Sequence, residues 1–306
     1  MSGAAQLPKP ESQREPLPPG LSAKLVDDFA RDGAVCLRQV LTTKEIDRLR
    51  SGIDANLAAP SPRAIVASPS GDPGLFIEDF CNWQSNPAYH DVIFNSNLAR
   101  VARALMRSRS VRLYHDHMLT KEPGTRTPTP WHQDQPYYNV EGRQNVSFWI
   151  PVDPVRRHST LEFLAGSHLG PWLMPRTFMT QQAKWFPEGS LADLPDVEAL
   201  RRNSADGAGH GSGDRAAASA SDPARILGWA LEPGDLVAFH MLSLHAAAGV
   251  DGDVRRRVFS VRFLGDDMRH APRAWKTSPE FAGLADELPA GAPMDHALFP
   301  LLIGDD

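Results

Sequence analysis

A histidine and an aspartate lie two residues apart in the stretch TPWHQDQPYY, which runs from Thr129 to Tyr138. If this stretch is a β-strand, His132 and Asp134 project from the same face, because alternate residues of a strand share a face. An imidazole and a carboxylate that converge in this way form half of a metal site, or an ion pair, or a pair without a function. The rest of the sequence must distinguish these three cases.

His245 is the best partner for this pair among the 11 histidines of the chain. It lies in VAFHMLSLHAAAG, and we expect it to close a strand that follows the turn EPGD at residues 232–235. Two histidines and a carboxylate on one face of an octahedral metal ion leave three positions open. Non-haem Fe(II) oxygenases use those positions for a bidentate co-substrate and O2. His132, Asp134 and His245 are therefore predicted metal ligands for Fe(II).

A basic segment, RRRVFSVRF, follows His245 at a distance that allows a turn and the start of another strand. An oxygenase that uses 2-oxoglutarate needs a counter-charge for the distal carboxylate, and the planar fork of arginine binds a carboxylate through two hydrogen bonds. In a strand, Arg256 and Ser260 share one face, whereas Arg255 and Arg257 share the other. Only one of these sets can point inward.

Together these motifs resemble the phytanoyl-CoA dioxygenase family. The matching parts are His132-Gln133-Asp134, His245, Arg256, TLEFLAGSH at 160–168, RRRVFSVRF and the N-terminal DGAVCLRQVLTTKEID, so that the resemblance covers roughly residues 21–265. It implies a mainly β fold, the double-stranded β-helix or cupin-like jelly roll, with packed N-terminal helices. It also implies that the two histidines and the aspartate bind Fe(II), that the arginine anchors 2-oxoglutarate, and that O2 is the oxidant.

The resemblance extends to further positions. Thr120 and Ser147 fall near the places where family members contact the co-substrate, although Thr120 departs from the amide side chain that some members carry. Halogenases of the family have a small residue in place of the carboxylate to admit a halide, whereas this chain has Asp134. The predicted reaction is therefore hydroxylation of an unactivated C–H bond of a small molecule, with release of succinate and CO2.

Four residues are candidates for substrate binding. Tyr138 matches a family position that faces the substrate. His117 lacks a matched carboxylate and third ligand, so we expect it to be buried or on the substrate side and not a metal ligand. Trp149 belongs either to the core of the β-structure or to the substrate pocket. Arg262, a charged residue in an apolar strand, either reaches solvent or binds an anionic substrate or co-substrate.

Two other functions remain open at this stage. Three nitrogen and oxygen ligands plus water also describe a catalytic Zn(II) or Mn(II) hydrolase, but Arg256 has no evident role there. A ligand-binding jelly roll without catalytic activity is the second alternative, and the intact set of three ligands speaks against it. The oxygenase consumes 2-oxoglutarate, the hydrolase does not, and the binding protein needs no metal.

The elements that carry these residues follow from the hydrophobic pattern. Ser22 predicts the start of a helix that runs to Arg31, Thr42 or Thr43 predicts the cap of a second helix, and residues 97–107 predict a third. Residues 33–41 read as a strand, and short strands separated by turn signals follow from Val111 onward. We expect a disordered tail at 1–20 and one oxygenase domain at 21–306, with a flexible insertion at about 203–222.

Composition excludes several other classes. The chain has 306 residues and a formal net charge of -5, which argues against a nucleic-acid partner. No apolar run approaches the ~20 residues of a membrane helix, and the N-terminus lacks the apolar segment of a signal peptide, so we expect a cytoplasmic protein without a membrane partner. Two cysteines exclude a disulfide framework. A small-molecule substrate is thus the expected partner, and the sequence does not indicate an oligomeric state.

Overall fold

The structure is a computed structural model of the chain, and it describes residues 16–174, 191–206, 225–250 and 252–304. Most of the expected tail, and the expected insertion from residue 207 onward, therefore lie outside the described residues. Residues 16–20 end in a turn, and residues 203–206 form the end of helix α5 (Val197–Asp206). Among the described residues, no helix is long and apolar enough to span a membrane.

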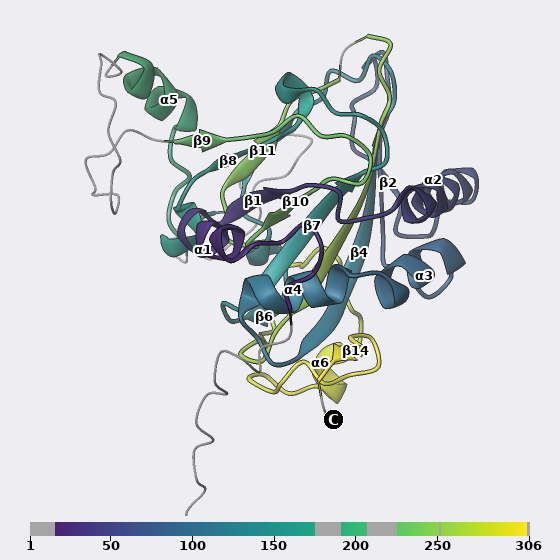
Figure 1. The fold of residues 1–306 in the computed structure, drawn as a ribbon, viewed down its shortest axis with the longest axis vertical. Helices are drawn as coiled ribbons and strands as arrows, with labels where there is room; N and C mark the ends of the chain where they lie inside the picture. The colour runs from purple at the N-terminus through teal and green to yellow at the C-terminus, as the bar shows by residue number, and fades with distance from the viewer. Residues whose placement is uncertain (1–15, 175–190, 207–224, 251, 305–306) are drawn as a thin grey trace, which may run out of the picture.

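One large antiparallel sheet forms the frame of the molecule (Figure 1). In order across the sheet, its strands are β1 (Ala34–Leu37), β10 (Leu236–Phe239), β7 (Asn145–Pro151), β12 (Arg256–Leu264), β4 (Val111–Lys121), β3 (Phe76–Phe80) and β2 (Ile65–Val66), and β14 (Leu301–Ile303) also pairs with β4. The neighbours β12, β4 and β7 are far apart in the sequence, so the sheet joins distant segments.

A smaller sheet faces the inner side of this frame. Its strands, in order, are β5 (Thr129–His132), β11 (His245–Ala247), β8 (Leu161–Leu164) and β9 (Ile226–Leu227), and a separate pair joins β6 (Val140–Glu141) to β13 (Arg269–His270). Between β4 and β12 the chain passes repeatedly from one of the two larger sheets to the other, so the architecture is the predicted double-stranded β-helix. The fold class expected from the sequence is confirmed.

Helices cover the outer face of the large sheet (Figure 1). They are α1 (Ala23–Asp32), α2 (Thr43–Ala58), α3 (Pro87–Asn95) and α4 (Leu98–Met106), and a short helix, α6 (Leu284–Glu287), lies near the C-terminus. Ser22 caps α1 as predicted. Thr42, not Thr43, caps α2, and its side chain and that of Glu45 form a reciprocal capping box.

Alternate residues of β12 separate two regions of the interior. Phe259, Val261 and Phe263 are buried against the apolar residues of the helices. Val258 points the other way and packs with Trp149 between the two sheets. Because every second side chain of a strand points to the same face, β12 contributes to the helix-covered core with one face and to the space between the sheets with the other. That inner space holds the candidate site.

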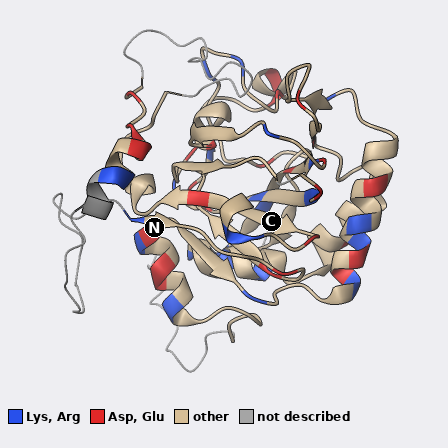
Figure 2. Ribbon diagram, turned by 90° about the horizontal axis from the view of Figure 1, so that it is seen from above, with Lys and Arg blue, Asp and Glu red and all other residues tan. Residues whose placement is uncertain are grey.

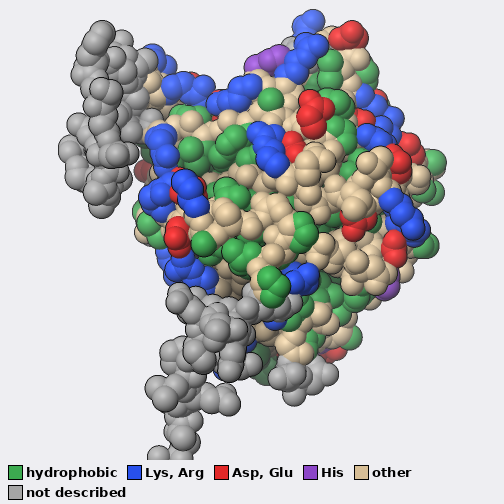
Figure 3. All heavy atoms as spheres, in the orientation of Figure 1, with side chains coloured by type: hydrophobic (Ala, Val, Ile, Leu, Met, Phe, Trp, Pro, Cys, Tyr) green, Lys and Arg blue, Asp and Glu red, His purple; other side chains and the backbone are tan. Residues whose placement is uncertain are grey.

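The outer surface carries charges of both signs. Acidic and basic residues are interspersed along the peripheral helices (Figure 2), and the face seen in Figure 3 shows the same mixture. On α1, Lys24 pairs with Asp28 at 2.6 Å, and on α2, Arg50 pairs with Asp47 at the same distance. Such exposed pairs contribute little to stability, and their mixture is typical of a solvated surface.

The structure corrects one strand boundary and adds elements that the sequence did not predict. The strand expected at 33–41 ends at Leu37, because Gln39 takes a left-handed conformation with φ of 51°. Strand β3 and helix α3 were not predicted. Gly33, expected as the first residue of that strand, instead caps the C-terminus of α1: its φ is 77°, and a Cβ there would collide with the His168 ring.

Candidate metal centre

The backbone brings the predicted ligands together in a way that differs from the prediction. Strand β5 ends at His132, and Asp134 precedes a short 3-10 helix, with a helical φ of −73° and ψ of −45°. His245 opens β11 and does not close the strand before it. The two histidines are direct partners across the antiparallel β5–β11 pair. We expected His132 and Asp134 to share one face of a single strand. Instead, the two histidines face each other across neighbouring strands, and Asp134 lies in the turn that follows β5.

The three side chains converge on one point. One ligand atom from each of His132, Asp134 and His245 lies within 4.8 Å of the others, and all three residues are buried. Asp134 Oδ1 is 3.5 Å from His132 Nε2 and 3.8 Å from His245 Nε2. Two imidazole nitrogens and one carboxylate oxygen in this arrangement fit a metal such as iron.

Backbone carbonyls orient both rings. His132 Nδ1 donates to the carbonyl of Pro130 at 2.7 Å, and His245 Nδ1 donates to that of Ser243 at 2.9 Å. With the proton on Nδ1, each Nε2 presents a lone pair to the centre, as metal-ligating histidines usually do. Burial, aided by His132, lowers the pKa of His245 to about 3, so this ring is neutral at physiological pH.

The second oxygen of Asp134 is held by other side chains. Asp134 Oδ2 is 3.3 Å from Arg262 Nη2 and 3.4 Å from Ser147 Oγ. Arg262 also donates to Tyr138 Oη and to Ser260 Oγ, each at 3.0 Å. Burial alone raises the pKa of Asp134, but Arg262 and the histidines outweigh it and hold that pKa well below its usual range. Asp134 is thus ionised, and its Oδ1 would be available to a metal ion.

Because Arg262 fixes this carboxylate, we expect Arg262→Met to lower the affinity for Fe(II) by roughly 10–100-fold, the effect typical of losing a residue that orients a metal ligand. Anaerobic Fe(II) titration against a competing chelator measures it. The control is Arg255→Met, since Arg255 pairs with Glu122 at 2.8 Å and does not line the cavity. Equal Fe(II) affinities in the two variants would contradict a positioning role for Arg262.

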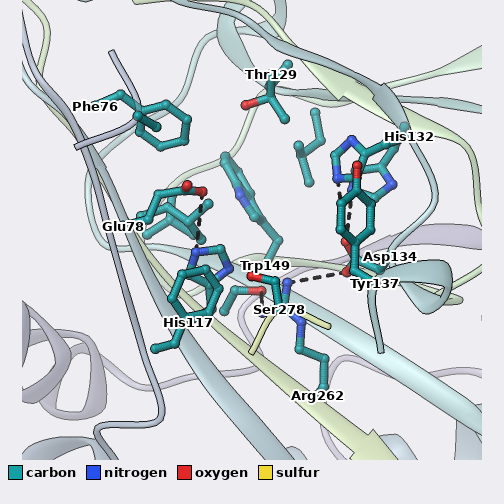
Figure 4. A pocket seen from close by; sticks show the side chains of 18 of the residues that line it. Phe76, Glu78, His117, Thr129, His132, Asp134, Tyr137, Trp149, Arg262 and Ser278 are labelled. Carbon is teal, nitrogen blue, oxygen red and sulfur yellow. Dashed lines mark hydrogen bonds and ion pairs between the residues drawn. The ribbon is translucent and has the colours of Figure 1, made fainter. Parts of the chain in front are cut away.

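A cavity of about 250 Å³ lies beside the three ligands, between the two sheets (Figure 4). Its walls are largely aromatic and aliphatic. Of the residues proposed from the sequence, the structure brings eight to this cavity: His132, Asp134, His245, Arg256, Tyr138, His117, Trp149 and Arg262. A concave, mainly apolar space with a few convergent polar groups is the usual form of a small-molecule site.

Arg256 enters the cavity from the first position of β12. Val258 and Ser260 line the cavity with it, as the predicted alternation requires. Its neighbour Arg257 does not line the cavity and binds Asp153 at 2.7 Å. The side-chain alternation inferred from the sequence is therefore present in the strand.

Arg256 is a buried cation without an acidic partner in the described part of the chain. Only 5% of it is exposed, its guanidinium donates to the carbonyl of Ser159, and its Cζ lies 5.7 Å from the centre of the Trp149 ring. Burial lowers its pKa to about 10. Lys121, its cross-strand partner, is also buried and donates to two backbone carbonyls. Such uncompensated positive charge fits a carboxylate ligand.

Two predicted residues lie elsewhere. Thr120 does not line the cavity; its hydroxyl contacts Met118 Sδ at 3.2 Å, and Met118 belongs to the helix-covered core. The reason is geometric, because Lys121 and Leu119 occupy the inward positions of β4. Ser147 contacts the outer oxygen of Asp134 and does not line the cavity either. The structure thus gives neither residue a contact with the space for a co-substrate.

Sequence reasoning missed one charged residue of the cavity wall, Glu78, which comes from the unpredicted strand β3. Lys121, the last residue of β4, also lines the cavity. The segment FIEDF at 76–80 contains the signal, because Phe76, Glu78 and Phe80 alternate with Ile77 and Asp79 and all three line the cavity. A strand of five residues is too short for this pattern to stand out.

Comparison with known proteins agrees with this geometry. The family model "Phytanoyl-CoA dioxygenase (PhyH)" matches residues 29–258. A search of curated protein sequences gave no match. SnoK, SnoN and EctD are among the solved structures that share the fold. The carbocyclase SnoK from nogalamycin biosynthesis is 19% identical, with a TM-score of 0.66 over 92% of this chain and 96% of its own. The epimerase SnoN, in complex with Fe3+, alpha ketoglutarate and nogalamycin RO, is 20% identical, with a TM-score of 0.68 over 91% and 97%.

The third structure is EctD from S. alaskensis with 2-oxoglutarate and 5-hydroxyectoine, which is 18% identical, with a TM-score of 0.59 over 90% of this chain and 86% of its own. At these identities the similarity concerns the fold. The family match covers most of the chain and includes His132, Asp134, His245 and Arg256. The chain therefore belongs to the phytanoyl-CoA dioxygenase family of Fe(II)- and 2-oxoglutarate-dependent oxygenases.

Proposed function

We propose that this protein hydroxylates an unactivated C–H bond of a small molecule, using Fe(II), 2-oxoglutarate and O2. One observation carries the proposal: the three converging side chains and the guanidinium of Arg256, which has no acidic partner among the described residues, line the same cavity. A metal-dependent hydrolase with Zn(II) or Mn(II) has no use for a buried arginine of this kind. A non-catalytic binding protein has no use for the three buried metal ligands.

Each part of the site has a defined task. Bound iron and 2-oxoglutarate supply the oxidation of a C–H bond by O2, with succinate and CO2 as co-products. His132, His245 and Asp134 would hold the metal at the wall of the cavity, which all three residues line. Arg256 binds the distal carboxylate of 2-oxoglutarate, and Trp149 packs over the guanidinium and excludes water from it. The apolar walls orient the substrate and keep the reacting centre dry.

Asp134 supports hydroxylation over halogenation, because its carboxylate occupies the position that a halide needs. The solved structures with this fold include those of a carbocyclase and an epimerase, so the outcome of the reaction depends on how the substrate is placed. A cavity of about 250 Å³ supports a small molecule as the substrate. The proposal of a hydroxylase therefore makes a claim about the product that can be measured.

The test is a turnover assay on the Fe(II)-loaded protein with 2-oxoglutarate and a panel of small molecules. We expect succinate to form in proportion to a product that is heavier by one oxygen atom, and isotope-labelled O2 to place its label in that product. A product with a new ring or an inverted centre and no added oxygen would assign a different oxidation to the same site. Hydrolysis without consumption of 2-oxoglutarate would favour the hydrolase.

A further inference from the structure

Glu78 and His117 form a polar pair in the cavity wall that the proposed chemistry does not use. Glu78 lies on β3 and His117 on the neighbouring β4. Figure 4 shows both side chains across the cavity from His132 and Asp134, with Trp149 between the two groups. Their exposed fractions are 4% and 6%. The pair therefore faces the space in which a substrate must lie to reach the metal.

The two side chains do not satisfy each other. Glu78 Oε1 is 3.4 Å from His117 Nε2, and neither atom makes a hydrogen bond. A buried polar atom without a hydrogen bond costs about 1–3 kcal/mol, so it is uncommon in native proteins unless a ligand or water completes it. The distance and the missing hydrogen bonds indicate that a third group completes this pair.

Among the described residues, no positively charged group contacts the carboxylate of Glu78. The His117 ring stacks on Phe80 at 3.9 Å between ring centres. Burial lowers the pKa of His117, although Glu78 opposes the shift, so the imidazole is neutral at physiological pH. Lys121, the other inward cation of β4, directs its ammonium to the carbonyls of Thr127 and Ala248. Apart from His117, no basic side chain among the described residues lies within ion-pair distance of Glu78.

The charges of the cavity wall can be assigned one by one. Asp134 is paired with Arg262. Arg256 lies opposite Lys121, whose pKa burial and Arg256 hold well below its usual value, so the guanidinium is the positive group that suits the carboxylate of 2-oxoglutarate. Glu78 is the remaining acidic group among the described residues that line the cavity. Its buried carboxylate needs a cation, because an isolated charge in an apolar space is strongly disfavoured.

We propose that Glu78, with His117 beside it, binds a protonated nitrogen of the substrate, so that the substrate is a small molecule with an amine. This inference rests on the proposed function, because it takes Arg256 as the site of 2-oxoglutarate. The amine donates a charge-assisted hydrogen bond to Glu78. The neutral ring of His117, which lies beside Glu78, fixes the direction of that hydrogen bond. The bound amine thereby holds the rest of the substrate in the apolar space toward the metal ligands.

The test measures the binding of matched pairs of probes to the protein loaded with Zn(II) and 2-oxoglutarate. The probes are n-butylammonium with n-butanol, cyclohexylammonium with cyclohexanol, and benzylammonium with benzyl alcohol, and ligand-observed NMR gives their dissociation constants. Wild type is expected to bind at least one amine roughly tenfold more tightly than its alcohol. Glu78→Gln, which keeps the shape and removes the charge, is expected to abolish this preference.

Glu122→Gln is the matched control, because Glu122 follows β4 but pairs with Arg255 away from the cavity; it should keep the preference. If no probe pair shows a preference in wild type, or if the preference survives in Glu78→Gln, the inference is wrong. If Glu78→Gln does not fold, Glu78→Asp replaces it; the shortened side chain should lower the preference at least about threefold, and an unchanged preference overturns the inference.

A separate arm distinguishes this inference from the proposed function. Anaerobic Fe(II) and 2-oxoglutarate give a visible charge-transfer band only if the co-substrate chelates the metal. A band without any preference for amines overturns the assignment of Glu78 alone. A preference for amines without a band overturns the 2-oxoglutarate chemistry and, with it, the basis of the inference.

Discussion

Replacing Arg256 by alanine is expected to weaken the binding of 2-oxoglutarate by roughly 100-fold, which corresponds to about 2.8 kcal/mol. The guanidinium is buried in the cavity and has no acidic partner among the described residues, so its charge is available to the co-substrate. Losing a two-point, charge-assisted contact in a dry site is costly. Titration of 2-oxoglutarate into the anaerobic Fe(II) protein, followed by the charge-transfer band, measures the change.

Arg257→Ala is the matched control for this prediction. Arg257 is the next residue of β12, but its side chain binds Asp54 and Asp153 on the other side of the strand. We expect its loss to leave the affinity for 2-oxoglutarate unchanged. Arg256→Lys should recover only part of the affinity, because an ammonium lacks the planar fork. A similar loss in the variants at 256 and 257 would mean that Arg256 does not contact the co-substrate.

Replacing Asp134 by alanine is expected to abolish tight Fe(II) binding and to lower the free energy of unfolding of the metal-free protein by about 3–5 kcal/mol. The second effect arises because Arg262 loses its partner and remains as an uncompensated buried charge. Chemical denaturation monitored by circular dichroism measures the stability. The double variant Asp134→Ala/Arg262→Met should recover most of it, and a double variant as unstable as the single one would refute this coupling.

The same pair makes the stability of the protein dependent on pH. Arg262 and the two histidines outweigh burial and hold the pKa of Asp134 well below its usual value of about 4. The stabilisation that ionised Asp134 gives to the folded protein is therefore complete when the pH is above that usual value. It is lost as the pH falls through the lower pKa that Asp134 has in the folded state. Wild type should lose stability in acid more steeply than the double variant does.

The metal ligands could be predicted because short sequence motifs contain the residue types that bind such a metal. His132 and Asp134 are two residues apart, and Arg256 follows His245 closely in the sequence. The convergence was confirmed although the expected backbone was wrong: β5 ends at His132, and β11 begins at His245. Cross-strand register, which placed the two histidines opposite each other, depends on turns that the hydrophobic pattern does not specify.

The rest of the cavity wall could not be predicted, because it depends on which face of a strand points inward. Thr120 and Lys121 are neighbours on β4, and a shift of one residue exchanges their environments. The resemblance suggested Thr120, but the structure directs Lys121 to the cavity. Glu78 escaped notice because its significance arises only when β3 pairs with β4 and places it beside His117. A lone acidic residue in a short segment carries no such information.

The most direct test of the central claim is an anaerobic titration of the metal-free protein with Fe(II) and then with 2-oxoglutarate. We expect a visible charge-transfer band in wild type and none in His132→Ala, which lacks one of the three ligands. That result would establish a metal chelated by 2-oxoglutarate at this centre. If iron binds to wild type but no band forms, the claim is contradicted, and Zn(II)-dependent hydrolysis becomes the activity to test.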